Sequence, residues 1–227
     1  NRQVSLLEAC YSGETPDDLC AEEWMLIDLV RNDREANSGL QAYLRNMMGV
    51  MVFDVQRRGR LITQAELSEY SRMLATSVTE ALYYFIGHGD PSPCPEVRYL
   101  AVTAAHITHM LRDTFEDAEA GYFNIPGEYL HGYGIAPGDV NSQAYREWVT
   151  KRVQLARRYF DMGRDCMAQV KNLRCRLAGY AYTARFEWVL RAIEREGCNL
   201  RPDYSERKSL RAAIWMGWSI LTSIFVP

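Results

Sequence analysis

Residues Ala101–Pro126, AVTAAHITHMLRDTFEDAEAGYFNIP, carry the densest chemical pattern in the chain. Winding this stretch as a helix at about 100° per residue gathers its polar side chains within one arc. That arc holds His106, His109, Asp113, Glu116 and Asp117. The opposite arc is apolar and holds Ala104, Ile107, Leu111 and Phe115. One face of the helix can therefore pack into a core, while the other presents imidazoles and carboxylates.

Asp113 and Asp117 are four residues apart, so their carboxylates point the same way on a helix and can meet one cation together. Oxygen ligands of this kind suit Mg²⁺, which keeps several waters and takes substrate phosphates at its free positions. His106 and His109 share this face, and imidazole is better suited to transition metals. The alternative is a solvated acidic face, which commonly has the same spacing.

The chain has 227 residues, of which 48% are hydrophobic and 24% charged, as in an ordinary globular protein with a sizeable core. Its net charge of −3 and the absence of a basic block argue against nucleic acid as a partner. Six scattered cysteines without a CxxC pair predict free thiols in a cytoplasmic protein. The chain begins at Asn1 rather than Met, which predicts a fragment or a processed chain.

Hydrophobic periodicity predicts helices over 21–31, 40–57, 63–87 and 142–162, with one or two more over 164–196. Thr63 and Glu66 have the spacing of a capping box. Residues 1–20 are weakly patterned and resemble a loop, whereas the Gly/Pro-rich segment 121–141 suits a lid over a site. Because no alternating strand pattern or repeat occurs, we expect a single all-α domain over residues 1–227.

Two of these helices carry further candidate residues. Asp54 lies at the edge of an apolar stripe, so it is either paired with Arg57 or Arg58 or aimed into a cavity. On the following helix, Tyr70, Ala75 and Val78 fall on the inward face. The small residues at 75–77 leave room for a bulky ligand or for close packing of another helix.

The C-terminal segment 212–227, AAIWMGWSILTSIFVP, carries no charge. It is shorter than the roughly 20 residues that a bilayer crossing needs. We expect either a final core helix or an interfacial anchor with Trp215 and Trp218 near lipid headgroups. The second alternative would make the protein membrane-associated.

The order of motifs resembles the squalene/phytoene synthase family of head-to-head prenyl synthases. The segment LRDTFED at 111–117 is similar to the family's second aspartate-rich motif. Upstream, Gly49-x-Met51-x-x-Asp54 resembles its GMxxD motif, and residues 66–78 resemble its ELxxY and AxxV run. Downstream, ARRYFDMG at 156–163 resembles its YxxxG helix, and RPDYSERK at 201–208 resembles its RxxxSxxK motif.

This resemblance implies an all-helical prenyl-synthase bundle in which Mg²⁺ holds the diphosphates of two prenyl substrates beside an apolar central cavity. The substrates would be farnesyl or geranylgeranyl diphosphate, with NADPH required if a reductive squalene-type step follows. By position, Arg112 and Tyr70 would be catalytic. The implied metal ligands are Asp113, Asp117 and His109, and the implied substrate-binding residues are Ala75, Val78, Asp54, His106 and Lys208.

The chain departs from the family pattern at several positions. His109 and His106 stand where the family usually has Asn and Gln, and Phe186 replaces a Tyr. The usual GRxYxP is GYFNIP at 121–126. Residues 1–40 contain no first aspartate-rich motif, so we expect that motif upstream of residue 1 and little activity from these 227 residues alone.

Two other functions remain open at this point. The lost family residues are compatible with a member without catalysis that binds isoprenoids or a partner protein. The helical face at 106–117 is also compatible with a metal-dependent hydrolase, for which His131 is the other candidate ligand.

Overall fold

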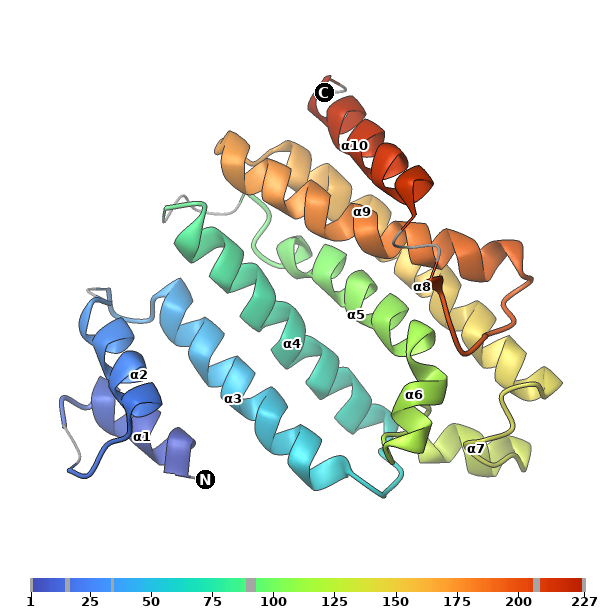
Figure 1. The fold of residues 1–227 in the computed structure, drawn as a ribbon, viewed down its shortest axis with the longest axis horizontal. Coiled ribbons are helices and arrows are strands. Elements are labelled where there is room, and N and C mark those ends of the chain that lie inside the picture. The colour runs from blue at the N-terminus through green and yellow to red at the C-terminus, as the bar shows by residue number, and fades with distance from the viewer. Residues whose placement is uncertain (1, 15–16, 34, 89–92, 206–208, 226–227) are drawn as a thin grey trace.

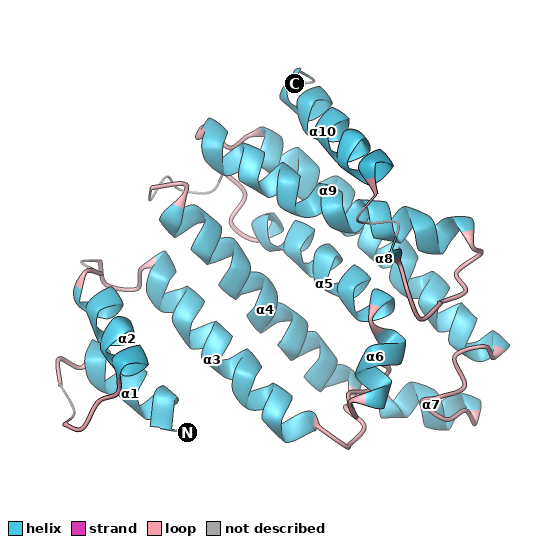
Figure 2. Cartoon of the chain, in the orientation of Figure 1, coloured by secondary structure: helices cyan, strands magenta, loops and turns pink. Residues whose placement is uncertain are grey.

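The structure, a computed structural model, describes residues 2–14, 17–33, 35–88, 93–205 and 209–225, and within these ranges it contains helices and no strands (Figures 1 and 2). The elements are α1 (Arg2–Tyr11), α2 (Ala21–Arg31), α3 (Gly39–Arg57), α4 (Gln64–Phe85), the 3₁₀ turn η1 (Val97–Tyr99), α5 (Leu100–Arg112), α6 (Thr114–Glu119), α7 (Gly127–Tyr133), α8 (Gln143–Ala168), α9 (Leu173–Arg195) and α10 (Leu210–Phe225). The predicted all-α class is confirmed.

The helices α3, α4 and α5 lie side by side, α9 lies next to α5, and α8 packs against both α5 and α9 (Figure 1). The pair α1–α2 packs at the outer edge of α3, and α10 lies at the opposite edge, against α9. None of the helices in the described ranges combines the length and apolar character needed to cross a bilayer.

The largest apolar cluster fills the space between α5, α8 and α9. A glycine allows this close approach, because a Cβ built on Gly163 of α8 would lie 2.6 Å from the Cβ of Ala101 on α5. The large buried side chains of this cluster include Ile107, Phe160 and Leu190. The glycine of the YxxxG-like motif therefore acts in helix packing, bringing α8 against the helix that carries the aspartates.

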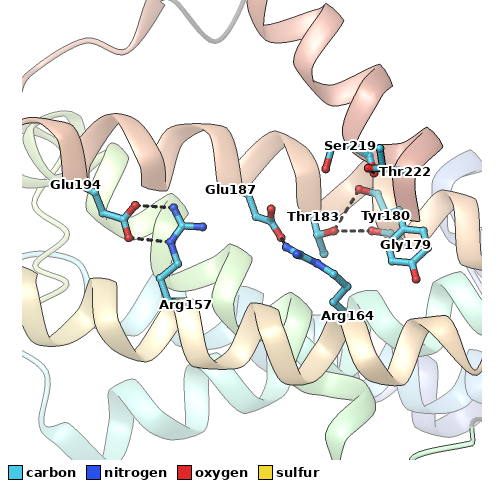
Figure 3. A network of polar contacts seen from close by, with 9 residues as sticks. All are labelled: Arg157, Arg164, Gly179, Tyr180, Thr183, Glu187, Glu194, Ser219 and Thr222. Carbon is cyan, nitrogen blue, oxygen red and sulfur yellow. Dashed lines mark hydrogen bonds and ion pairs between the residues drawn. The ribbon is translucent and has the colours of Figure 1, made fainter. Parts of the chain in front are cut away.

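Ion pairs also join α8 to α9 (Figure 3). Arg157 makes two bonds to the carboxylate of Glu194, at 2.7 and 2.6 Å, and Arg164 Nη2 lies 2.6 Å from Glu187 Oε1. The Glu187 side chain is only 5% exposed, so its charge is held in the interface by the more exposed arginine. These contacts fix the register of the two helices and thereby support α5.

The stretch predicted as one helix over residues 101–126 is broken at Asp113, which separates α5 from α6. The Thr114 hydroxyl donates to the backbone carbonyls of Met110 and Leu111, a back-bonding pattern that bends helices. The Asp117 N–H nevertheless donates to the Asp113 carbonyl at 2.7 Å. The spacing of the two aspartates along the chain axis is therefore close to the helical one.

Three other segments differ from their sequence predictions. Residues 1–20 contain α1, whose Leu6 and Leu7 are buried, with Leu7 packing beside Val30 and Leu40. Segment 121–141 contains α7, and α8 continues past 162 to Ala168. The capping box of α4 is present as predicted. Short helices such as α1 lack a strong periodic signal, so tertiary burial decides whether they form.

Candidate active site

Asp113, at the junction of α5 and α6, is held by two neighbouring side chains. The Arg112 guanidinium donates to both of its carboxylate oxygens, and His109 Nε2 lies 2.8 Å from Oδ2. Burial alone would raise the pKa of Asp113, but the bonds from Arg112 and His109 hold that pKa well below its usual range. Asp113 is therefore an ionised carboxylate in a fixed orientation.

Asp117, one turn further on, has the opposite electrostatic balance. Its Oδ2 accepts a bond of 2.6 Å from Nδ2 of Asn124, a buried residue in the segment after α6. Burial and the charge of Asp113 together raise the pKa of Asp117 despite that bond. Two carboxylates of like charge repel each other in a half-buried site. They therefore favour a cation between or beside them.

Arg57, at the end of α3, extends this network into a third element. It is 6% exposed, donates to Asp54 Oδ1 at 2.7 Å and donates to Asn124 Oδ1 at 2.8 Å. Its guanidinium carbon lies 4.8 Å from the ring centroid of Tyr70 and 4.9 Å from that of Tyr122. The predicted pairing of Asp54 with Arg57 is confirmed, and the alternative partner Arg58 instead donates to the Ala120 carbonyl.

Tyr70 of α4 closes the network, since its hydroxyl lies 3.3 Å from Asp54 Oδ2. Burial and the Asp54 charge raise the pKa of Tyr70, so the phenol stays protonated at neutral pH. Two backbone hydrogen bonds join the segment after α6 to the connection between α3 and α4. Gly59 N donates to the Gly121 carbonyl, and Gly127 N donates to the Ile62 carbonyl, both at 2.8 Å. The first part of the segment predicted as a lid is thus tied to the α3–α4 turn.

His106 lies one turn before His109 and is only 3% exposed. Its ring meets the Tyr70 ring edge-on, with 5.0 Å between centroids, and neither ring nitrogen has a hydrogen-bond partner. Burial, with smaller effects from nearby cations, lowers the pKa of His106 to about 3. At neutral pH the site therefore contains an uncharged imidazole with one unused donor and one unused acceptor.

The remaining predicted residues lie in different places. Phe186 of α9 faces the half-exposed His109, with 6.2 Å between ring centroids. Ala75 instead lines a separate cavity with Ile107 and Arg152, whereas Val78 is half-buried on α4. Lys208 lies outside the described residues. The structure therefore gathers Asp54, Tyr70, His106, His109, Arg112, Asp113 and Asp117 at one end of the helical layer, without Ala75.

Sequence reasoning missed the roles of Asn124 and Tyr122. In the sequence, both are departures from the family's GRxYxP pattern, in which an Arg stands at the position of Tyr122. Here the cation beside this segment comes from Arg57 of α3. The available signal was the position of Asp54 near two arginines, which offered Arg57 as one of two possible partners but gave no indication of Asn124, 67 residues after Arg57.

The carboxylates of Asp113 and Asp117 can supply some of the ligands of a Mg²⁺ ion. In the described ranges, no group of three or more His, Cys, Asp or Glu side chains is placed to hold a metal. Mg²⁺, however, commonly binds one or two carboxylates and takes its other ligands from water and phosphate. Burial, with the added charge of Asp113, raises the pKa of Asp117, and a bound cation would offset both effects.

Comparison with known proteins gives the family. The sequence profile of "Squalene/phytoene synthase" matches residues 25–213, which include every site residue described above. The chain belongs to the squalene/phytoene synthase family. A search of curated proteins found no match.

The fold of this family member also matches a solved structure, the crystal structure of squalene synthase HpnC from Alicyclobacillus acidocaldarius. The TM-score is 0.68 at 20% sequence identity, and the match covers 88% of this chain and 76% of that one. At this identity the likeness establishes the helical fold. The chemistry must be argued from the residues themselves.

Proposed function

We propose that this member of the squalene/phytoene synthase family takes part in head-to-head condensation of two prenyl diphosphates, with farnesyl or geranylgeranyl diphosphate as substrates. The observation that carries the proposal is the pair of anchored carboxylates, Asp113 and Asp117, beside the buried cation of Arg57. A diphosphate needs cationic partners, and the ionisation of an allylic diphosphate needs its leaving group stabilised in a site poor in water.

Each site residue then has a defined task. Asp113 and Asp117 would hold Mg²⁺, which supplies charge stabilisation to the departing diphosphate. Arg112 and Asn124 orient the two carboxylates, and Arg57 connects Asn124 to α3. Because Arg57, Asn124 and Asp117 form one continuous chain of bonds, displacement of any member changes the direction of the Asp117 carboxylate.

Tyr70 and His106 form the neutral part of the site. The two aromatic rings pack together, and the raised pKa of Tyr70 and the lowered pKa of His106 keep both uncharged at neutral pH. A neutral aromatic wall suits an allylic cation, because ring faces attract positive charge and a charged imidazole would repel it. We therefore assign Tyr70 and His106 to the side of the site that faces the prenyl chain.

The test is Mg²⁺-dependent binding and turnover of farnesyl and geranylgeranyl diphosphate. We expect calorimetric binding of the diphosphates with Mg²⁺, and release of diphosphate when the full-length protein is incubated with them. Asp117→Asn should lower Mg²⁺-dependent affinity at least tenfold, whereas Asp161→Asn, an exposed carboxylate on α8, should leave it unchanged. Binding without diphosphate release would point to an isoprenoid-binding protein. Failure of wild-type protein to bind either diphosphate would reject the metal-site proposal.

We also propose peripheral contact with a membrane through α10. Its exposed face carries an apolar stripe of Leu210, Ile214, Trp218 and Leu221, which are 52–75% exposed. Beside it, Arg191 lies 4.4 Å from the Trp215 ring centroid, and Arg195 lies 5.6 Å from that of Trp188. An apolar stripe bordered by cations suits the interface of an anionic bilayer, where prenyl substrates with long chains also partition.

A further inference from the structure

A cavity of about 370 Å³ lies between α4, η1, α5 and α8, away from the aspartates. Its volume falls in the range of small-molecule sites, about 300–1,000 Å³. The apolar part of its lining comprises Leu67, Ala75, Ile107 and Leu155. Ile107 is two residues from His109 and therefore lies about 200° around α5 from it. The cavity therefore lies on the side of α5 away from His109, while Arg152 in its lining is near enough to His106 to help lower the pKa of that imidazole.

Arg152 of α8 brings a cation into the lining of this cavity. The side chain is half-buried, and no described carboxylate pairs with it. The guanidinium carbon of Arg152 lies 5.9 Å from the ring centroid of Trp148. Burial lowers the pKa of Arg152 to about 10, so it still carries its charge at neutral pH. A desolvated charge without a counter-ion is costly, and a bound anion would offset that cost.

The other charged side chains lining the cavity are the cation Arg72 and the carboxylate Glu96, and neither forms an ion pair with Arg152. Arg72 makes its own ion pair with Glu69, at 2.6 Å. Glu96 is exposed at the rim, and no ion pair joins it to Arg152. Ser71, which is 7% exposed, has a buried hydroxyl without a hydrogen-bond partner. The lining therefore combines an unpaired cation, an unused hydroxyl and an apolar wall.

We infer that this cavity binds a small amphipathic anion, whose carboxylate or phosphate group meets Arg152 and whose hydrocarbon part packs on Leu67, Ile107 and Leu155. The Ser71 hydroxyl adds a hydrogen bond from α4. The inference goes beyond the proposed prenyl transfer, because the cavity lining includes neither aspartate and none of the residues that hold them. A carboxylate and a phosphate head satisfy the same guanidinium, so the experiment includes both.

Decanoate and decyl phosphate are suitable probes, with decanol as the uncharged match, each titrated calorimetrically into the 227-residue chain. We expect at least one anion to bind at least tenfold more tightly than decanol. Arg152→Met should weaken that anion at least tenfold. Arg158→Met, which removes an exposed arginine from the same helix, and Asp117→Asn should leave its affinity unchanged. The better probe then identifies the head group as carboxylate or phosphate.

A second variant keeps the test decisive if Arg152→Met fails to fold. Ser68 is exposed at the cavity rim, so Ser68→Trp places a large ring in the opening without disturbing the core. Loss of anion binding in Ser68→Trp supports the inference. Absence of anion binding to the wild type, equal binding of decanol, or undiminished affinity in Arg152→Met or in Ser68→Trp would overturn it.

Discussion

Arg57 Nη1 donates to Asn124 Oδ1 at 2.8 Å, joining the end of α3 to the segment after α6 across 67 residues of sequence. Both side chains are buried, and each has a second partner: Asp54 for the arginine and Asp117 for the asparagine. This bond connects the carboxylate of the GMxxD-like motif to the second carboxylate of the LRDxxED-like motif. The two motifs therefore act as one polar network.

The first prediction concerns the metal-free stability of the two aspartate variants, which we expect to change in opposite directions. Asp113→Asn should destabilise the fold by about 1.5–3 kcal/mol, because it breaks charged hydrogen bonds to Arg112 and His109. Asp117→Asn should raise the melting temperature, since burial disfavours that carboxylate's charge. Thermal unfolding in EDTA measures both. Equal destabilisation by the two variants would contradict the electrostatic assignment.

A second prediction follows from the sign of the pKa shift of Asp117. Its raised pKa means that the carboxylate takes up a proton at a higher pH than an ordinary aspartate. Mg²⁺ must displace that proton, so Mg²⁺ affinity should weaken as pH falls through the raised pKa and should rise above it. Calorimetry in two buffers of different ionisation enthalpy would detect proton release on Mg²⁺ binding. Binding that is independent of pH in the acid range would exclude Asp117 as a ligand.

His106 gives the third prediction, a loss of stability in mild acid. The pKa of His106 in the folded protein, about 3, lies below its ordinary value of 6.5. The neutral His106 therefore contributes to the free energy of unfolding above pH 6.5, and this contribution is lost as pH falls below that value. The loss should reach about 1.4 kcal/mol per pH unit below pH 6. His106→Gln should flatten the dependence between about pH 6.5 and 5, before ordinary carboxylates titrate. The control is His131→Gln, at an exposed position; a similar flattening there would refute the assignment.

The fourth prediction tests helix packing through two glycines. Gly163→Ala should destabilise by about 1–3 kcal/mol, because the new Cβ would meet the backbone of Ala101 at 2.8–2.9 Å. Gly217→Ala on α10 meets no atom within 4 Å and should stabilise by up to about 1 kcal/mol. Urea denaturation compares the two variants. A neutral Gly163→Ala would show that α5 and α8 can separate without cost.

The fifth prediction concerns α10 and lipid. Co-sedimentation with vesicles of phosphatidylserine and phosphatidylcholine should retain the wild type and lose most of the Trp218→Glu variant, which places a charge in the exposed apolar stripe. Met25→Glu is the matched control, because Met25 is 73% exposed on α2 at the other edge of the layer. Vesicles of phosphatidylcholine alone should bind less, since Arg191 and Arg195 then lose their anionic partners. No binding to either vesicle would reject the membrane contact.

The helical framework was predictable because its signals are local. Periodicity located α2, α3 and α4, and the Thr63–Glu66 capping box marked the start of α4, since side chains one turn apart determine both features. The break at Asp113 was missed, because it depends on the back-bonding of Thr114 and on pairing of Asp113 with Arg112. Neither contact changes the hydrophobic pattern.

The sequence by itself determined the all-helical class, the order of family motifs and the spacing of Asp113 and Asp117, since these are properties of residues near one another in the chain. Only the tertiary structure decided which side chains meet them. Periodicity assigns a residue to a helix face but not to a neighbour, so Ala75 was grouped with Tyr70 although it lines the cavity beside Arg152. For the same reason the bond between Arg57 and Asn124 emerged only when packing brought α3 against the segment after α6.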